Sequence, residues 1–217
     1  MAVSALQLSE LVLHGAAFLC GIVGAAALTV TQGAFGGRCV LYGAATWNGT
    51  ALGLESFSHV SLCYFVSAVS ILVALYCFAA LLCGIYSCCA DESWRDRAWL
   101  SVALAVASVI LFFLLISACI LRTGMDALCT SVVRAASLAS CQEAQRKPWP
   151  PYDSSRFYSN LYSAQAAAWV NVFAWCLLLV LLAVQRQREA PFTLLRRGDP
   201  EWSAETEAIF GGRPARP

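Results

Sequence analysis

Four long apolar runs without charge constrain this chain more than any other feature. Each run holds 20 to 25 residues, and none contains Asp, Glu, Lys or Arg. The hydrocarbon core of a bilayer is about 30 Å thick and needs about 20 helical residues to cross it. Inside lipid, a helix satisfies all of its own backbone N–H and C=O groups. The sequence therefore predicts four transmembrane helices, at residues 11–30, 62–86, 99–121 and 164–184.

Composition agrees with a membrane protein. The chain is 59% hydrophobic and 12% charged, whereas soluble domains average about 25% charged residues. The expected fold class is an all-α membrane protein, a four-transmembrane-helix bundle (tetraspan), with the lipid bilayer as its surroundings. A net charge of +1 gives no electrostatic reason to expect a nucleic-acid partner. The segments between and outside the spans are 1–10, 31–61, 87–98, 122–163 and 185–217.

The first run has an alternative interpretation. It ends in the small-residue stretch "GAAALT" and is therefore also compatible with a cleaved signal peptide. No Lys or Arg precedes it, and the run is long for a signal core, which favours a retained span. The segment that follows is translocated in either case.

Charge, a sequon and cysteines together predict the orientation. Residues 1–10, 87–98 and 185–217 carry eight Lys and Arg in 55 positions, against six in the 73 positions of residues 31–61 and 122–163. This weak bias has the sign of the positive-inside rule. Asn48-Gly49-Thr50 is a glycosylation sequon, although such triplets also arise by chance. We expect both termini in the cytoplasm and residues 31–61 and 122–163 on the opposite side.

Four cysteines lie in or beside the two segments that we expect to be extracytoplasmic. They are Cys39, Cys63, Cys129 and Cys141. An even set confined to one side of a membrane is typical of disulfides in an oxidising compartment.

Several short stretches resemble one family. They are "GRCVLYG" (37–43), "LCYF" (62–65), "SACILR" (117–122), "SCQEAQ" (140–145), "FYSNL" (157–161), "WVN" (169–171) and "RGDPEW" (197–202). With these stretches the chain resembles the transmembrane protein 179 family over nearly its whole length. The resemblance implies a four-pass membrane protein without an established enzymatic activity. The layout of the loops is also similar, more faintly, to vesicle tetraspans of the MARVEL type.

Three modifications are predicted at named residues. Among the three pairings that four cysteines allow, we favour the local one, Cys39–Cys63 and Cys129–Cys141. Asn48 is expected to carry a glycan.

Cys88 and Cys89 follow the second span directly, on the side expected to be cytoplasmic. Thiols there stay reduced, and cysteines at the lipid boundary are common sites of S-palmitoylation, which we favour over the alternative that both are small apolar fillers at the end of the helix.

The sequence argues against catalysis and predicts no cofactor or metal site. The only histidines are His14, expected at the membrane interface, and His59, expected in solvent. No Cys-x-x-Cys pair, zinc-protease motif or P-loop occurs. The triplet Arg197-Gly198-Asp199 falls in the expected cytoplasmic tail and is not treated as an adhesion signal.

Transport and helix packing are the remaining roles that polar and small residues in the spans could have. Carriers usually place an ionisable group in mid-membrane, and the deepest polar side chain here is Asn171. We favour a hydrogen bond from Asn171 to a neighbouring helix over a role in a transport path. Small residues at Ala17, Gly21 and Ala25 form a stripe that favours close packing, within the bundle rather than in a dimer.

Two further segments each allow two interpretations. "RKPWPPYD" (146–153) either exposes its aromatic residues to a partner or covers the ends of the helices. In the tail, "FTLL" (192–195) has the spacing of an adaptor-binding sorting signal, and residues 199–210 either form a short amphipathic helix or fray.

The interpretation that we favour is a structural or trafficking tetraspan of the plasma membrane or of secretory-vesicle membranes, with other membrane proteins or trafficking adaptors as partners. A small channel or transporter is the alternative.

Overall fold

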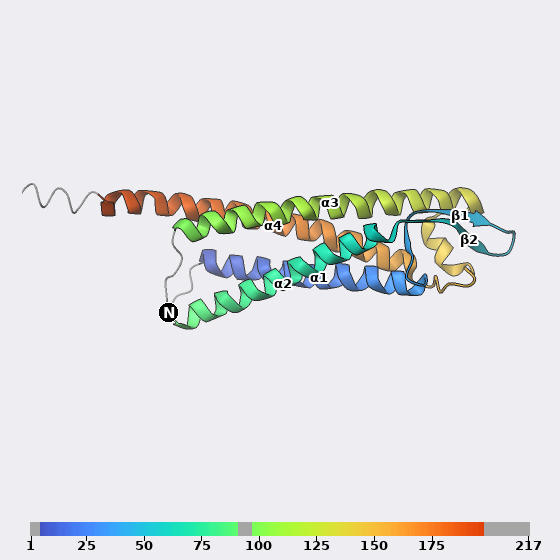
Figure 1. The fold of residues 1–217 in the computed structure, drawn as a ribbon, viewed down its shortest axis with the longest axis horizontal. Helices are drawn as coiled ribbons and strands as arrows, with labels where there is room; N and C mark the ends of the chain where they lie inside the picture. The colour runs from blue at the N-terminus through green and yellow to red at the C-terminus, as the bar shows by residue number, and fades with distance from the viewer. Residues whose placement is uncertain (1–4, 91–96, 198–217) are drawn as a thin grey trace, which may run out of the picture.

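The computed structural model describes the backbone of residues 5–90 and 97–197, and the side chains of residues 5–87 and 98–188. In chain order the elements are α1 (Ala5–Ala34), β1 (Cys39–Trp47), β2 (Leu52–Ser58), α2 (Val60–Ala90), α3 (Arg97–Ala136), the 3-10 helix η1 (Cys141–Arg146) and α4 (Phe157–Arg197). The four helices run along the long axis, and the strands lie at the end opposite to the start of α1 (Figure 1). We call the end with the strands the hairpin end, and the other the terminal end.

Each predicted span lies inside one helix. All four helices are long and apolar enough to cross a membrane. Their backbones are satisfied internally, which a segment in hydrocarbon requires. The prediction of an all-α four-helix membrane bundle is confirmed. The chain is a multi-pass membrane protein.

The four helices form a ring that is less tightly closed at one seam. α1 packs along both α2 and α4, and α3 packs along α4, whereas α2 and α3 contact each other much less. α2 runs obliquely and separates from α3 toward the terminal end (Figure 1). The interior of the ring contains Ala17 of α1, Val73 of α2, Leu114 of α3 and Trp175 of α4. The α2–α3 seam is therefore the least covered side of this interior.

α3 continues well past its apolar run, which ends at residue 121. An exposed ion pair follows directly, with Arg122 Nε 2.9 Å from Asp126 Oδ2. This pair is spaced one helical turn apart and supports a helix in water. The helix ends only where Ser137 adopts a φ of 49°. Hydropathy marks where the membrane ends, not where the helix ends, so α3 extends into the segment expected to be a loop.

The small-residue stripe of α1 packs within the bundle, as expected. Ala17 is fully buried. At Gly21, an added Cβ would lie 2.9 Å from the Ser70 backbone oxygen and 3.0 Å from the Ala74 Cβ of α2. The absence of a side chain at this position is what allows α1 and α2 to approach so closely.

Gly21→Ala is expected to lower the free energy of unfolding by about 1–3 kcal/mol, because the methyl group would push α1 away from the backbone of α2. Gly15→Ala on the same helix is the matched control, since nothing lies within 4 Å of a Cβ there. Thermal unfolding of both purified variants in one detergent measures the difference. Equal stabilities would contradict the close packing at Gly21.

The two strands were not predicted from the sequence. β1 and β2 form a two-stranded antiparallel sheet with irregular register between Cys39 and Ala45. The signal that could have found it is Asn48-Gly49, a turn pair between two β-prone runs. Gly49 has a φ of 79°, and the Asn48 N–H donates to the Ala51 carbonyl oxygen at 3.1 Å. The hairpin is an addition to the predicted helical fold and does not alter it.

Candidate interaction site at the hairpin end

Two disulfides fix the hairpin end. Cys39 at the start of β1 is bonded to Cys63 in the first turn of α2. Cys129 of α3 is bonded to Cys141 of η1. The structure thus has the local pairing that we favoured. Each bond closes one loop of the hairpin end without joining the two loops to each other.

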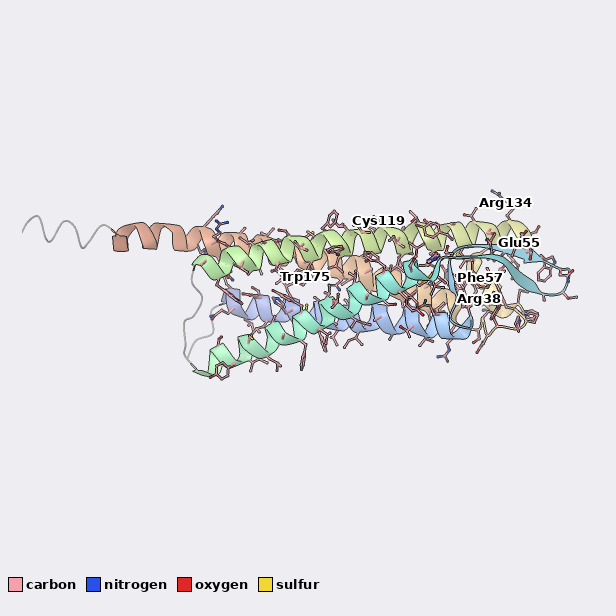
Figure 2. All side chains as sticks on the ribbon, viewed as in Figure 1. Arg38, Glu55, Phe57, Cys119, Arg134 and Trp175 are labelled. Atoms are coloured by element: carbon pink, nitrogen blue, oxygen red, sulfur yellow. A yellow bond between two sulfur atoms is a disulfide. The ribbon has the colours of Figure 1, made fainter. Side chains whose placement is uncertain are left out.

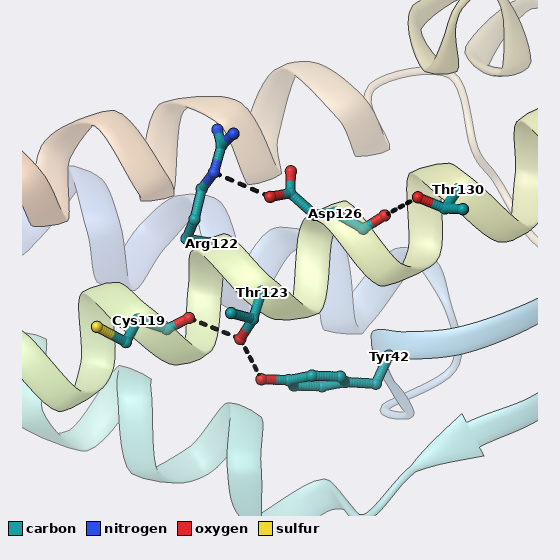
Figure 3. Close-up of polar contacts among 6 residues, drawn as sticks. All are labelled: Tyr42, Cys119, Arg122, Thr123, Asp126 and Thr130. Carbon is teal, nitrogen blue, oxygen red and sulfur yellow. Dashed lines mark hydrogen bonds and ion pairs between the residues drawn. The ribbon is translucent and has the colours of Figure 1, made fainter.

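β1 rests on the part of α3 that extends beyond its apolar run. The Ala45 N–H donates to Ser131 Oγ at 2.7 Å. The Tyr42 hydroxyl is hydrogen-bonded to Thr123 Oγ1, which itself donates to the Cys119 carbonyl oxygen (Figure 3). An added Cβ at Gly124 would lie 3.0 Å from the Leu41 Cβ. Strand and helix therefore form one packed unit.

An aromatic cluster closes the other side of this unit. Trp149 is 2% exposed, and its ring lies edge-on to Phe35, with centroids 6.0 Å apart, and 5.3 Å from Phe157. Its indole Nε1 donates to the Ala144 carbonyl oxygen at 2.8 Å. The Leu52 N–H of β2 donates to the Pro148 carbonyl oxygen at 3.0 Å. Of the two alternatives for residues 146–153, the structure shows the one in which they cover the helix ends.

A shallow groove lies between β1 and α3 on the surface of this unit. Its lining residues are Ala45, Asp126, Ala127, Thr130, Ser131, Arg134 and Ala135. We call it the head groove; its volume is about 520 Å³. Asp126 and Arg134 give it charges of both signs, and Arg134 lies on the outer surface of the hairpin end (Figure 2). Such a surface is better suited to a polar contact with another protein than to catalysis.

A charged turn precedes α4. The Ser155 N–H donates to Asp153 Oδ1 at 3.1 Å. This backbone hydrogen bond, with a further bond from the Ser155 hydroxyl and the nearby Arg156, lowers the pKa of Asp153. A lowered pKa means that the turn keeps these bonds at neutral pH and loses them as the pH falls through that pKa.

The predicted modification sites lie in different parts of the molecule. Asn48 is exposed at the tip of the hairpin, and His59 is exposed as expected, with Nδ1 2.7 Å from Ser61 Oγ. Cys88 and Cys89 lie in the last turn of α2, but their side chains are outside the described residues. S-palmitoylation there stays a prediction, as does the sorting signal at 192–195, whose side chains are also outside them. Residues 198–210, which include the tail segment, are outside the described backbone.

Two polar residues of the spans are buried within the bundle. The His14 ring lies with its centroid 6.1 Å from that of Trp175, and its position at the membrane interface stays a prediction. Asn171 is 2% exposed, but its Oδ1 has no hydrogen-bond partner among the described residues. The expected interhelical hydrogen bond is therefore not formed by this oxygen.

The sequence matches one known protein family over most of its length. The family described as Transmembrane protein 179/179B Claudin domain matches residues 6–210. The chain belongs to this family. A protein named Transmembrane protein 179B from Homo sapiens is 53% identical over 215 residues, which is 98% of each chain. Proteins of the same name from Mus musculus and Danio rerio are 46% and 44% identical, each over 97% of both chains.

The family match covers both the membrane helices and the hairpin end. It contains the two disulfides, the hairpin and the head groove between residues 6 and 210. These features therefore all lie within the matched residues. No solved structure matches the chain.

Proposed function

We propose that this protein is a structural or trafficking tetraspan of the plasma membrane or of secretory-vesicle membranes, and not an enzyme. In this proposal both termini are cytoplasmic and the hairpin end is extracytoplasmic. The hairpin end acts there as a recognition surface for another membrane protein. The observation that carries the proposal is the rigid construction of this end, which two disulfides, the β1–α3 contact and the Trp149 cluster hold in one shape.

A preformed surface is well suited to binding. A partner that binds a rigid surface loses less conformational freedom than one that must order a loop. The head groove adds charges of both signs, from Asp126 and Arg134, to that surface. Charges of this kind contribute more to partner choice and association rate than to affinity.

The alternative, transport through a path around Asn171, has less support. Asn171 is enclosed at 2% exposure. It does not line the head groove. Val172 and Trp175, which neighbour it on α4, belong to the apolar interior of the ring.

Proximity labelling tests the proposal. A biotin ligase fused to the carboxy terminus should label membrane proteins together with vesicle-coat, fusion or adaptor proteins. Arg134→Glu, which reverses a charge in the head groove, should remove specific membrane proteins from that set. Arg146→Glu is the matched control, because Arg146 is an exposed arginine of the hairpin end outside the head groove. Enrichment of transporter subunits alone, or no difference between the two variants, would contradict the proposal.

A glycan at Asn48 tests the orientation. We expect treatment with a glycosidase to increase the gel mobility of the wild-type protein, since the exposed hairpin tip is accessible to the transferase. Asn48→Gln should abolish that shift, and Thr50→Ala should do the same because it destroys the sequon. A carboxy-terminal tag that is accessible on intact cells would overturn the orientation.

A further inference from the structure

A cavity lies inside the terminal half of the bundle, at the level where the first apolar run begins. All four helices contribute to its lining, with His14 from α1, Tyr76 from α2, Ala107 from α3 and Trp175 from α4 among the lining residues. Its volume is about 110 Å³, which is room for a few water-sized groups. An apolar cavity of this size stays empty, whereas one with polar atoms in its wall can hold a polar group. The polar atoms therefore decide what this cavity binds.

Trp175 supplies a hydrogen-bond donor without an acceptor. Its side chain is 1% exposed, and its Nε1–H has no hydrogen-bond partner among the described residues. An indole N–H can only donate, and a buried donor that stays unpaired destabilises the fold. A ligand with an acceptor atom at this position would remove that cost.

His14 supplies an acceptor beside this donor. Its Nδ1 lies 2.9 Å from the Glu10 carbonyl oxygen, which can only accept, so Nδ1 carries the proton in the neutral ring. Nε2 is then an acceptor, and it forms no hydrogen bond with the described residues. The centroids of the His14 and Trp175 rings are 6.1 Å apart. The donor and the acceptor are thus close enough for one small group to bond with both.

A neutral hydroxyl group matches this pair of atoms. Its oxygen accepts one hydrogen bond and its proton is donated in another. A carbonyl group would satisfy Trp175 but not His14, and an ammonium group would satisfy His14 but not Trp175. None of the described residues that line the cavity is Lys or Arg, so a phosphate or carboxylate group would find no cation there. Water and the hydroxyl of a lipid share the chemistry that remains.

An apolar groove beside the cavity favours a lipid. The two spaces meet at Tyr76, which lines both. The groove lies on the loosely closed α2–α3 seam and has a volume of about 420 Å³. Its remaining lining residues are Phe65, Ala68, Val69, Leu72, Val73, Ile110 and Phe113.

The groove has the position and length of a lipid body. Leu72, Tyr76 and Phe113 are exposed on the surface of the spans, so the groove is open to the bilayer. From Tyr76 to Phe65, α2 rises by about 16 Å. A molecule with its hydroxyl in the cavity and its apolar body in the groove would lie along the helices. Its hydroxyl would then point toward the membrane surface at the terminal end, as in other lipids of that leaflet.

The lining of the groove favours a rigid body with no second polar group. Every lining residue except Tyr76 is apolar, so the groove has no partner for an ester or an amide. A rigid ring system also loses less conformational freedom on binding than a flexible chain does. A sterol combines these properties, because a single hydroxyl at one end of its fused rings is its only polar group.

We propose that the cavity and the groove together bind a sterol. The sterol oxygen accepts a hydrogen bond from Trp175 Nε1–H, and the sterol hydroxyl donates its proton to a hydrogen bond with His14 Nε2. The ring system passes Tyr76 and lies in the groove on the α2–α3 seam. The site is separate from the hairpin end and does not depend on the function proposed for that end.

Photolabelling of the full-length protein in phosphatidylcholine nanodiscs tests this proposal. The probe is a cholesterol analogue with a diazirine in its ring system and an alkyne in its tail. Labelled peptides are expected from α2 and α3 around the groove, and unlabelled cholesterol should compete.

Two competitors test the role of the hydroxyl. Cholestanol and its ketone, cholestanone, differ only at the oxygen. The ketone can accept from Trp175 but cannot donate to His14, so it should compete about fivefold less well, the loss expected for one neutral hydrogen bond. Diacylglycerol, which has a hydroxyl but flexible chains and two esters, should compete weakly.

Two variants assign these hydrogen bonds to residues. His14→Phe should lower labelling about fivefold, and cholestanol and cholestanone should then compete equally. A merely structural loss would not remove the difference between the two competitors. Trp175→Phe should lower labelling by a similar factor but keep the preference for cholestanol, because both sterols lose the same donor.

Two further variants test the groove. Ala68→Trp should block labelling by filling the groove that Ala68 lines. Ala79→Trp is the matched control and should leave labelling unchanged, because Ala79 is exposed on the same helix but lines neither space.

The proposal is supported if labelling lies around the groove, is lost in Ala68→Trp but not in Ala79→Trp, and prefers cholestanol except in His14→Phe. Absent labelling, labelling spread over all four helices, or equal labelling of all variants overturns it. Equal competition by cholestanol and cholestanone in the wild-type protein overturns the hydrogen bond to His14. Equal competition by diacylglycerol overturns the choice of a sterol.

Discussion

The double variant Cys39→Ala, Cys63→Ala is expected to lower the free energy of unfolding by about 3–4 kcal/mol, the largest loss among the disulfide variants. The bond closes a separation of 24 residues, against 12 for Cys129–Cys141. In the chain-entropy description, a longer closed loop restricts the unfolded chain more. Alanine is chosen because Cys39 and Cys63 are both fully buried, so that serine would also bury two hydroxyl groups.

Thermal unfolding in one detergent, followed by the loss of monomer on size exclusion, measures this effect. The control is Cys129→Ala, Cys141→Ala, which should cost slightly less, about 3 kcal/mol. The wild-type protein in reducing agent should approach the stability of a variant that lacks both bonds. Unchanged stability of the Cys39 and Cys63 double variant would show that the bond does not hold the hairpin to α2.

Trp149→Ala is expected to lower the free energy of unfolding by about 3–5 kcal/mol, as for other large aromatic residues removed from a packed core. The Trp149 ring fills the space between Phe35 at the end of α1 and Phe157 at the start of α4. The substitution also leaves the buried Ala144 carbonyl oxygen without its indole donor. Chemical unfolding measures this loss of stability when it is followed by far-ultraviolet circular dichroism, which reports helix content and not tryptophan fluorescence.

Trp47→Ala is the control for this prediction. Trp47 lies on β1 in the same part of the molecule but is only half-buried, with Lys147 Nζ 6.0 Å from its ring centroid. Its removal is expected to cost about 1 kcal/mol, since a partly exposed cation–π contact contributes little. Similar losses for the two variants would show that the Trp149 cluster is not the core of the hairpin end.

The transmembrane part of the fold could be predicted because membrane spans follow from length and hydropathy alone. A run such as 99–121 needs no knowledge of its neighbours to be assigned to the bilayer. The helix that contains it is longer, because Arg122 and Asp126 continue α3 in a way that hydropathy does not detect. Helix ends depend on local hydrogen bonds and on the φ of Ser137, which an apolar pattern does not encode.

The candidate sites were harder to predict because they depend on contacts between distant segments. Ser131 and Ala45 are 86 positions apart and meet only once β1 packs on α3. His14 was expected at the membrane interface because it lies near the start of its run. Its burial beside Trp175 depends on how α1 and α4 pack. The cysteines were easier, since four thiols on one side leave three pairings and the structure has the local one.

α3 is one uninterrupted helix of 40 residues, about 60 Å long at the usual rise per residue. It starts at the terminal end and finishes beside β1 (Figure 1). A continuous helix of this kind is stiff along its axis, so its two ends cannot tilt independently. A displacement of the hairpin end would therefore be carried along α3 to the terminal end. The sparse contact of α3 with α2 would restrain that displacement less than its packing along α4 does.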